Sequence, residues 1–453
     1  EITEKLMIEI YTKEILDFIK DRWHRKSSLV LILSLISVIL LKLFSEIKFD
    51  ELSYKFYAVL LTAFLIVTFL WYQYRKIPKI PDGTIGILIG IQYDDFGDKK
   101  KVTSDFIEII RSNFESKQRI YPFKIIELNN HHLEKIHQDT YIDYLFKKSN
   151  SRLILYGTTK TRLIRGKPTR ILNLNSWVLH TLIPKELSES LSDEFSKIYP
   201  WNIEIPMEDE YTGFKLQSEY FNYTAKFLLA TGSLITRDFD FSIHLFEEVK
   251  TWLDNDKNKN LFKLNLSKFL IPKLLEAYHN LASIYYNEWK KNPNTELINK
   301  FNKYVDKILS VYSYDYRALL LKAIFTFIVE NNADKALTLL KKCRRVQNNG
   351  WKYSVAFLFA YKNDLDRAYS YYISAIKTPG ENFPILDSET FIMMVLEKEP
   401  NNSSLYFALG ILNYYAKEDY ILAKDYFEKF LNLSQNNKFK TIVRNLLSNI
   451  TKI

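Results

Sequence analysis

The chain has 453 residues, a formal net charge of +10 at pH 7 and a single cysteine, Cys343. One cysteine excludes an internal disulfide and agrees with a reducing compartment. The length leaves room for two or three domains besides any membrane segment, and the positive charge fits a neighbouring anionic membrane or nucleic acid.

Residues 1–26 predict an amphipathic helix that ends in a basic flank. Apolar side chains at Ile8, Tyr11, Ile15 and Phe18 recur at helical spacing, and charged side chains lie between them. We expect this helix to pack on a neighbouring domain or to lie against a membrane surface.

Two apolar runs follow the basic flank. The first, residues 27–44, holds no charge before Lys42, and the second, residues 56–74, holds none. At the rise of an α-helix each run reaches roughly 27 to 29 Å, about the thickness of the hydrocarbon core of a bilayer. The segment between them is too short for a domain, so residues 27–75 predict an antiparallel transmembrane hairpin.

Lysine and arginine side chains flank this hairpin at both of its ends. They are Lys20, Arg22, Arg25 and Lys26 before the first run, and Arg75, Lys76 and Lys79 after the second. The connecting loop is mixed in charge, so the excess of positive charge places both termini in the cytoplasm. The sequence therefore predicts a multi-pass protein of the cell membrane.

Residues 82–210 predict a small α/β domain. Three expected strands alternate with two expected helices, in the order 85–92, 103–116, 123–128, 132–148 and 152–156. This order predicts parallel strands joined by right-handed crossovers. Residues 157–170 are expected to turn into a further strand that ends near His180.

The segment LILYGTTKTR, followed by RGKPTRILNLNSWVLH, resembles the strand, YG turn and β-hairpin of TolB-N or FlgO-like α/β domains. In bacteria such domains often precede tetratricopeptide repeats. The resemblance covers about 100 residues and implies only the fold.

A basic block lies in this segment. Six basic residues and no acid occur between residues 151 and 170: Arg152, Lys160, Arg162, Arg165, Lys167 and Arg170. A block of one sign attracts an opposite partner through its field. That partner is anionic lipid, nucleic acid, or the chain's own acidic stretch at residues 186–210; the sequence leaves the three open.

No residue pattern in the chain indicates catalysis. The glycines at 83, 86 and 90 do not match a dinucleotide-binding spacing, and His132 and His137 are five residues apart, so they do not share one helix face as metal ligands. We interpret His131, His132 and His137 as surface residues. We expect no cofactor and no enzymatic activity.

Residues 211–453 predict paired helices with repeating positions. In residues 405–437 large, Leu-Gly, Ala and aromatic residues recur, with one residue inserted in the turn: Tyr406, Leu409, Gly410, Ala423 and Phe427. This segment resembles a tetratricopeptide repeat, and about five more or less degenerate copies are expected. The resemblance implies a superhelix whose concave surface binds a peptide or helix of another protein. Cys343 is expected in its core.

The expected architecture is thus a transmembrane helical hairpin, a small α/β domain and a C-terminal all-α repeat superhelix. It favours a non-enzymatic, membrane-tethered adaptor that recruits a cytoplasmic protein. Two-helix segments joined to a sensing module also resemble membrane-disrupting effectors of prokaryotic antiviral systems, which act by oligomerisation. That second function stays open at this point, and nucleic acid enters either one only indirectly.

Overall fold

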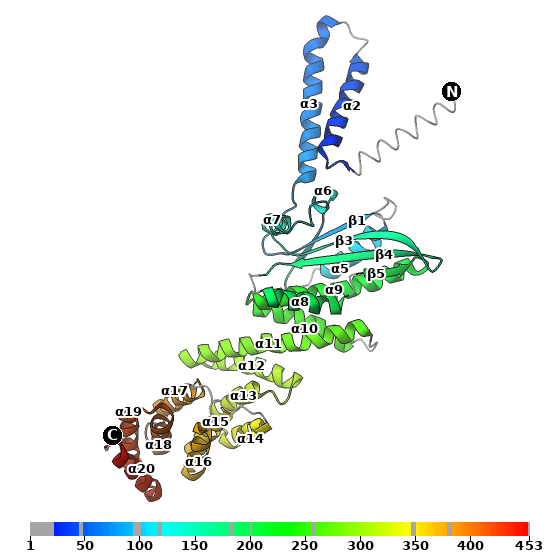
Figure 1. Ribbon diagram of the computed structural model, residues 1–453. Helices are drawn as coiled ribbons and strands as arrows, with labels where there is room; N and C mark the ends of the chain where they lie inside the picture. Colours follow the sequence, from blue (N-terminus) through cyan, green and yellow to red (C-terminus); the bar gives the residue numbers. More distant parts are fainter. Residues whose placement is uncertain are drawn as a thin grey trace. The chain divides into compact units, whose positions relative to one another are not determined.

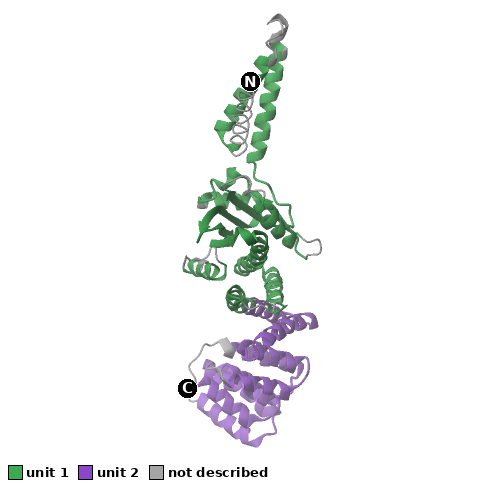
Figure 2. Cartoon of the chain, turned by 90° about the vertical axis from the view of Figure 1, so that its right-hand side faces the viewer, with its two compact units in different colours: residues 1–274 green, residues 275–453 purple. Residues whose placement is uncertain are grey.

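The computed structural model describes residues 22–44, 49–93, 101–115, 120–180, 185–199, 202–255, 260–345, 350–377 and 383–451. The chain divides into two compact units, Glu1–Leu274 and Leu275–Ile453, shown in green and purple in Figure 2. The amphipathic helix expected at the start of the chain, together with Lys20, lies outside the described residues.

Two long helices open the described part of the first unit. Helices α2 (Lys26–Phe44) and α3 (Phe49–Arg75) pack against each other (Figure 1). Large apolar side chains on both helices are exposed, among them Val30, Val38 and Leu65.

One of the two expected membrane spans is supported. Within the described residues, the segment Phe56–Arg75 is long and apolar enough to cross a membrane, and none of it is buried inside the protein. Helix α2 forms as expected, but the described residues hold no second candidate span.

A mixed sheet forms the centre of the first unit. Its strands lie in the order β2-β1-β3-β4-β5 and are β1 (Ile85–Tyr93), β2 (Phe123–Glu127), β3 (Ser151–Ile164), β4 (Lys167–Val178) and β5 (Asn202–Pro206). Strand β1 runs parallel to both β2 and β3, which confirms the parallel arrangement predicted for these three strands. Strands β4 and β5 extend the sheet in antiparallel pairing.

The structure corrects the expected turn at Gly157. This residue lies inside β3, opposite Leu174 of β4. A Cβ atom there would lie 2.0 Å from the backbone oxygen of Asn173, so the glycine allows two strands to approach closely. The hairpin turns later, at Arg165 and Gly166, which both have positive φ.

Strand β5 was not predicted. It lies in the stretch taken as an acidic segment, and its alternating Ile203 and Ile205 are buried against the sheet. Five residues with two isoleucines give too short a period-two signal to separate a strand from a loop.

Helices cover both faces of the sheet (Figure 1). One face packs on the π-helical turn η1 (Thr103–Ile107), α5 (Glu108–Phe114) and α9 (Glu210–Ile235). The other face packs on α6 (Asn130–Leu133) and α7 (Asp139–Ser149), where Leu88 and Ile154 join their apolar cluster.

The helix expected at residues 132–148 is therefore two helices. Leu133 of α6 packs so closely over Gly90 of β1 that a Cβ atom on that glycine would lie 2.1 Å from it. Helix α6 ends at Leu133 after one turn, and α7 begins only after the extended Gln138.

The rest of the first unit is helical. It contains α8 (Lys185–Ile198), the short turn η2 (Met207–Asp209), α10 (Phe239–Asn255) and the beginning of α11 (Leu261–Lys291). Helix α9, which begins at the boundary expected between the α/β domain and the repeats, packs on β3, β4 and β5 as well as on α10.

The second unit is all-helical in its described residues. After α11 it contains α12 (Thr295–Val311), α13 (Tyr316–Ile328), α14 (Ala333–Lys341), η3 (Lys342–Arg345), α15 (Trp351–Tyr361), α16 (Leu365–Ile376), α17 (Phe383–Lys398), α18 (Ser403–Leu412), η4 (Asn413–Lys417), α19 (Tyr420–Leu433) and α20 (Asn437–Ile450). Helices α13 and α14, α15 and α16, and α18 and α19 pack as consecutive pairs.

The three pairs share one turn. In each, a residue with positive φ is followed by an Asp or Asn whose side chain accepts a hydrogen bond from the second helix: Asn331–Asn332, Asn363–Asp364 and Glu418–Asp419. The left-handed residue ends one helix and the next residue caps the other. The residues of this turn therefore repeat in all three pairs, although the apolar residues of the helices vary from pair to pair.

Candidate functional site

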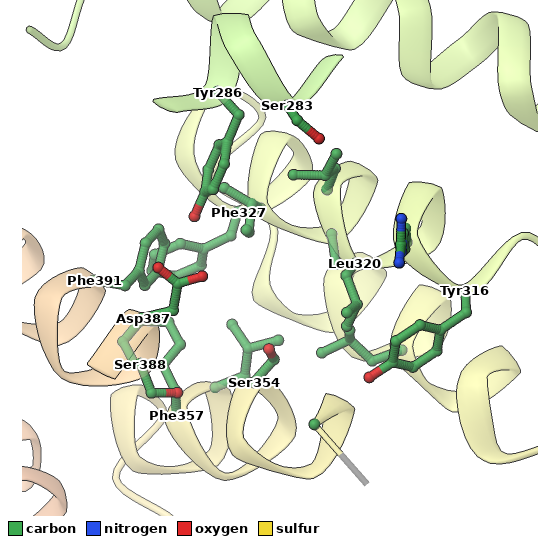
Figure 3. A pocket seen from close by; sticks show the side chains of 17 residues that line it. Ser283, Tyr286, Tyr316, Leu320, Phe327, Ser354, Phe357, Asp387, Ser388 and Phe391 are labelled. Atoms are coloured by element: carbon green, nitrogen blue, oxygen red, sulfur yellow. The ribbon is translucent and has the colours of Figure 1, made fainter. Parts of the chain in front are cut away.

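The second unit contains a half-open cavity of about 430 Å³ (Figure 3). Its walls come from α11, α13, α15 and α17, with contributions from the residues before α15 and from α14. Helices α13 and α15 are the first helices of their pairs. The lining is mainly apolar and aromatic, with a small number of hydroxyl and charged groups, which is typical of ligand and anchor pockets.

Three phenylalanines close one side of the pocket. Phe391 of α17 contacts Phe357 of α15 edge-to-face, with ring centroids 5.1 Å apart, and Phe327 of α13 at 6.1 Å. Figure 3 shows these rings beside Asp387 and Tyr286. Contacts of this kind contribute about 0.5–1.5 kcal/mol each beyond the burial of apolar area, so they fix α17 against the pairs.

The polar groups of the pocket include the carboxylate of Asp387 and the hydroxyls of two tyrosines. Asp387 of α17 accepts a hydrogen bond from Lys290 Nζ of α11 at 2.8 Å. Burial and the nearby Asp387 carboxylate raise the pKa of Tyr286, so its hydroxyl stays protonated and able to donate. Burial likewise raises the pKa of Tyr316 to about 12.

Arg317 differs from these groups. Its side chain is exposed at the pocket and forms no ion pair or hydrogen bond with any described residue. The pocket thus combines apolar walls with a guanidinium whose donors are not used within the described chain.

Helix α17 is an addition to the pattern of pairs. Helix α18 packs directly on α15 and α16, so the pair before α17 and the pair after it are neighbours. Helix α17 instead contacts α11 through Asp387, and Glu389 accepts hydrogen bonds from Asn413 and Lys417 of η4. It therefore lies across the first helices of several pairs and forms one wall of the pocket.

The expected repeat signature comes together in α18 and α19. Leu409, Gly410, Ala423 and Phe427 are all fully buried. A Cβ atom on Gly410 would lie 2.3 Å from the Phe427 ring, so glycine permits the close approach of the two helices. Tyr406 is half-buried, and its hydroxyl donates to the backbone oxygen of Pro400.

The turn of this segment, where one inserted residue is expected, begins with the π-helical turn η4 at the end of α18. Cys343 is fully buried, as expected, and burial raises its thiol pKa to about 11.

The basic block of residues 151–170 does not form a single exposed surface. Arg170 is fully buried, and its Nε donates to the carboxylate of Glu210, the first residue of α9. Lys101 Nζ lies 3.5 Å from the same carboxylate. Because β4 alternates its faces, Arg170 points toward the face of the sheet covered by α9, while Thr169 and Ile171 point toward the other face.

Two further cations of this block meet acids. Lys167 Nζ lies 3.3 Å from Glu208, and Arg152 lies 3.5 Å from Asp238. Glu208 belongs to the acidic stretch named as one possible partner. The remaining cations have no ion pair with the described residues: Lys160, Arg162 and Arg165.

A second cluster joins the base of the two long helices to α6. Before α2, His24 Nε2 lies 3.0 Å from Glu134 and Arg25 lies 2.6 Å from it. After α3, Arg75 Nε donates to His131 Nε2 at 3.3 Å, and Asn129 donates to the backbone oxygen of Tyr74. Both ends of the helix pair are thus held by residues 129–134.

The other flanking cations are placed differently. Arg22 and Lys26 are exposed before and at the start of α2, and Lys76 and Lys79 are exposed in the linker to β1. Arg75 lies over the Trp71 ring, 4.2 Å from its centroid, in a cation–π contact.

The histidines of α6 are buried, which corrects their interpretation as surface residues. Burial is the main cause that lowers the pKa of His131 and of His132 to about 4, and nearby Lys135 and Arg75 lower them further. Arg75 and Lys135 both point a donor at His131 Nε2, which therefore serves as an acceptor. Histidine runs give no burial signal in sequence, because polar side chains of this size occur in both settings.

No protein-family model matches this chain, and no curated protein matches it either.

Proposed function

We propose that the chain is a non-enzymatic, membrane-tethered adaptor that holds a cytoplasmic protein in the pocket of its C-terminal helical unit. The observation that carries this proposal is the cavity of about 430 Å³, with apolar and aromatic walls drawn from four helices. A fully formed apolar pocket with a few directed polar groups is what a protein uses to bind the anchor residues of a partner. The proposal requires no cofactor.

The tether is the pair α2 and α3. Their exposed apolar side chains suit lipid, and three of their hydroxyl groups bond within their own helices: Ser34 to Val30, Ser37 to Leu33 and Thr62 to Ala58. Such bonds satisfy these three groups in hydrocarbon. We infer that α2 spans the membrane beside α3, with Lys42 snorkelling to the far interface. Both termini then lie in the cytoplasm.

The binding unit is of the tetratricopeptide-repeat type. Its support is the buried signature of α18 and α19 and the turn shared by three helix pairs. In such arrays the first helices of the pairs line the binding face, and here α13 and α15 line the pocket. The α/β domain adds the half-buried Lys160 and the exposed Arg162 and Arg165, which suit the anionic inner leaflet.

The test uses the tagged full chain, extracted in mild detergent, and identifies co-purifying proteins by mass spectrometry. Leu321→Asp places a charge in the pocket, and Ile421→Asp places one on a residue that is 84% exposed on α19. The partner is expected to disappear only with the first variant, while both variants remain in the membrane fraction with wild-type helicity. If Leu321→Asp retains every partner, the adaptor proposal is wrong.

A second function is favoured by the cluster at α6. Because both ends of the helix pair contact residues 129–134, a change in the α/β domain reaches both helices together. This suits a membrane-disrupting effector of an antiviral system, in which copies of the hairpin associate. A triggered collapse of membrane potential that vanishes when residues 27–74 are exchanged for an unrelated anchor would support it. Collapse that survives the exchange would exclude it.

A further inference from the structure

Of the two charged side chains that line the pocket, one has an ion-pair partner in the described chain and the other has none. Asp387 is neutralised by Lys290 at 2.8 Å, and the nearby Asp315 is engaged by His279 at 3.0 Å. Arg317 alone among the charged lining residues has no partner within the described chain. An occupant of the pocket therefore gains most from carrying a carboxylate at this end.

The apolar part of the pocket near Arg317 lies on the same helix. Leu320, Leu321 and Ile324 follow it at helical spacing on α13, and all three line the pocket while remaining half-exposed. A bulky apolar side chain placed here removes their surface from water. We call this part of the pocket the free site: it consists of the cation Arg317 and the apolar side chains of Leu320, Leu321 and Ile324.

Helix α17 is a segment of the chain itself that already packs at this pocket, and its side chains show what the pocket can hold. Its Asp387 binds Lys290, and four residues later its Phe391 packs between Phe327 and Phe357. Positions four apart share one side of a helix, so α17 presents a carboxylate and an aromatic ring together. The free site repeats this pattern, with Arg317 in the place of Lys290 and the α13 side chains in the place of the phenylalanines.

We propose that the pocket binds an amphipathic helical segment of a partner protein that carries a carboxylate and a bulky apolar side chain about one turn apart, with Arg317 as the receptor of the carboxylate. The inference rests on the proposed adaptor function and names the chemistry of its partner. The segment docks beside α17 and leaves it in place.

The test titrates a fluorescently labelled peptide, with the sequence of residues 383–398, with the full chain in detergent micelles and follows its anisotropy. The peptide contains the acid and aromatic pattern of α17. A second peptide carries Asp387→Asn and Glu389→Gln, and is expected to bind about tenfold or more weakly, as for the loss of a charge-assisted contact.

The protein variants are matched by charge. Arg317→Glu is expected to weaken binding of the acidic peptide about tenfold or more, whereas Arg444→Glu, at an exposed arginine of α20, leaves it unchanged. A peptide with lysine at positions 387 and 389 is expected to prefer the Arg317→Glu protein over the wild type. Circular dichroism and the melting temperature verify that both variants fold.

Equal binding of the acidic and amide peptides, or wild-type affinity in Arg317→Glu, overturns the inference. Binding of phenylacetate, a small aromatic carboxylate, without binding of the peptide also overturns it, because the pocket then holds a small molecule. These failures leave the adaptor proposal standing if Leu321→Asp still removes the co-purifying partner. Retention of that partner in Leu321→Asp overturns the adaptor proposal even where the peptide binds as expected.

Discussion

Gly410 sets the distance between two helices by lacking a side chain. A Cβ atom at this position would lie within 2.3 to 3.0 Å of three atoms of the Phe427 ring, and Phe427 is fully buried. The ring has no free space to move into, because Phe430 and Ala423 beside it on α19 are also buried.

Gly410→Ala is therefore expected to destabilise the chain by about 1–3 kcal/mol, the usual cost of overpacking. Thermal unfolding followed by circular dichroism measures the loss. Phe427→Leu combined with Gly410→Ala is expected to recover part of it, because the smaller side chain leaves room for the methyl group. A stability of Gly410→Ala equal to that of the wild type would contradict the close packing of α18 and α19.

Arg170 and Lys167 are cations of one hairpin whose ion pairs contribute differently to the free energy of unfolding. Arg170 is fully buried and paired with Glu210, whereas Lys167 and its partner Glu208 are both about two-thirds exposed. Breaking a buried pair leaves a buried charge without compensation, while an exposed pair is screened by water.

Arg170→Met is expected to lower the free energy of unfolding by about 3–5 kcal/mol, and Lys167→Met by less than about 1 kcal/mol. Urea denaturation of the two variants in the same detergent measures both. Equal effects of the two substitutions would show that Arg170 is not buried against α9.

At the scale of elements, α6 has only four residues and connects the sheet to both long helices. It packs on β1 through Leu133, contacts the base of α2 through Glu134 and contacts the end of α3 through His131. Burial alone would raise the pKa of Glu134, but hydrogen bonds from Arg25 and His24 hold that pKa below its usual value.

This contact is expected to weaken on acidification. The pKa of His131 and of His132 is about 4 in the folded chain, and about 6.5 is usual for histidine in an unfolded chain. Between these values the unfolded state binds more protons, so the stability that the neutral histidines contribute is complete above about pH 6.5 and falls as the pH drops toward 4.

Hydrogen exchange of residues 129–134, corrected for intrinsic rates, is expected to be faster at pH 5 than at pH 7. In the double variant His131→Asn, His132→Asn the corrected rates are expected to depend much less on pH. Identical protection of the wild type at both pH values would contradict the burial of these imidazoles.

At the scale of the whole molecule, the exposed apolar helices and the polar remainder divide the chain into a part that suits lipid and a part that suits water. The segment Phe56–Arg75 is entirely unburied in the structure. Exposed apolar surface of this extent is costly in water and is removed by a bilayer.

The full chain is therefore expected to stay in the membrane pellet after carbonate extraction, whereas a variant without residues 27–74 appears in the supernatant as a folded protein. Immunoblotting of the two fractions measures the distribution. Retention of the deletion variant in the pellet, reversed by high salt, would show that cations of the α/β domain such as Arg162 and Arg165 hold the chain at the membrane without the two helices.

Short-range residue patterns in the sequence predicted most of the helices and the parallel strands. Apolar runs specified α2 and α3, helical spacing specified α5, and Gly410 with Ala423 and Phe427 specified the helix pair α18 and α19. These signals are short in range, since each depends on a period of two or 3.6 residues.

Tertiary structure alone decided which polar residues are buried and where the pocket lies. Arg170, His131 and His132 resemble surface residues in sequence, and their burial depends on Glu210, Arg75 and other groups far along the chain. The pocket likewise joins α11 with α17, about 100 residues apart, through Lys290 and Asp387. Such contacts have no local period, because they depend on how whole elements pack.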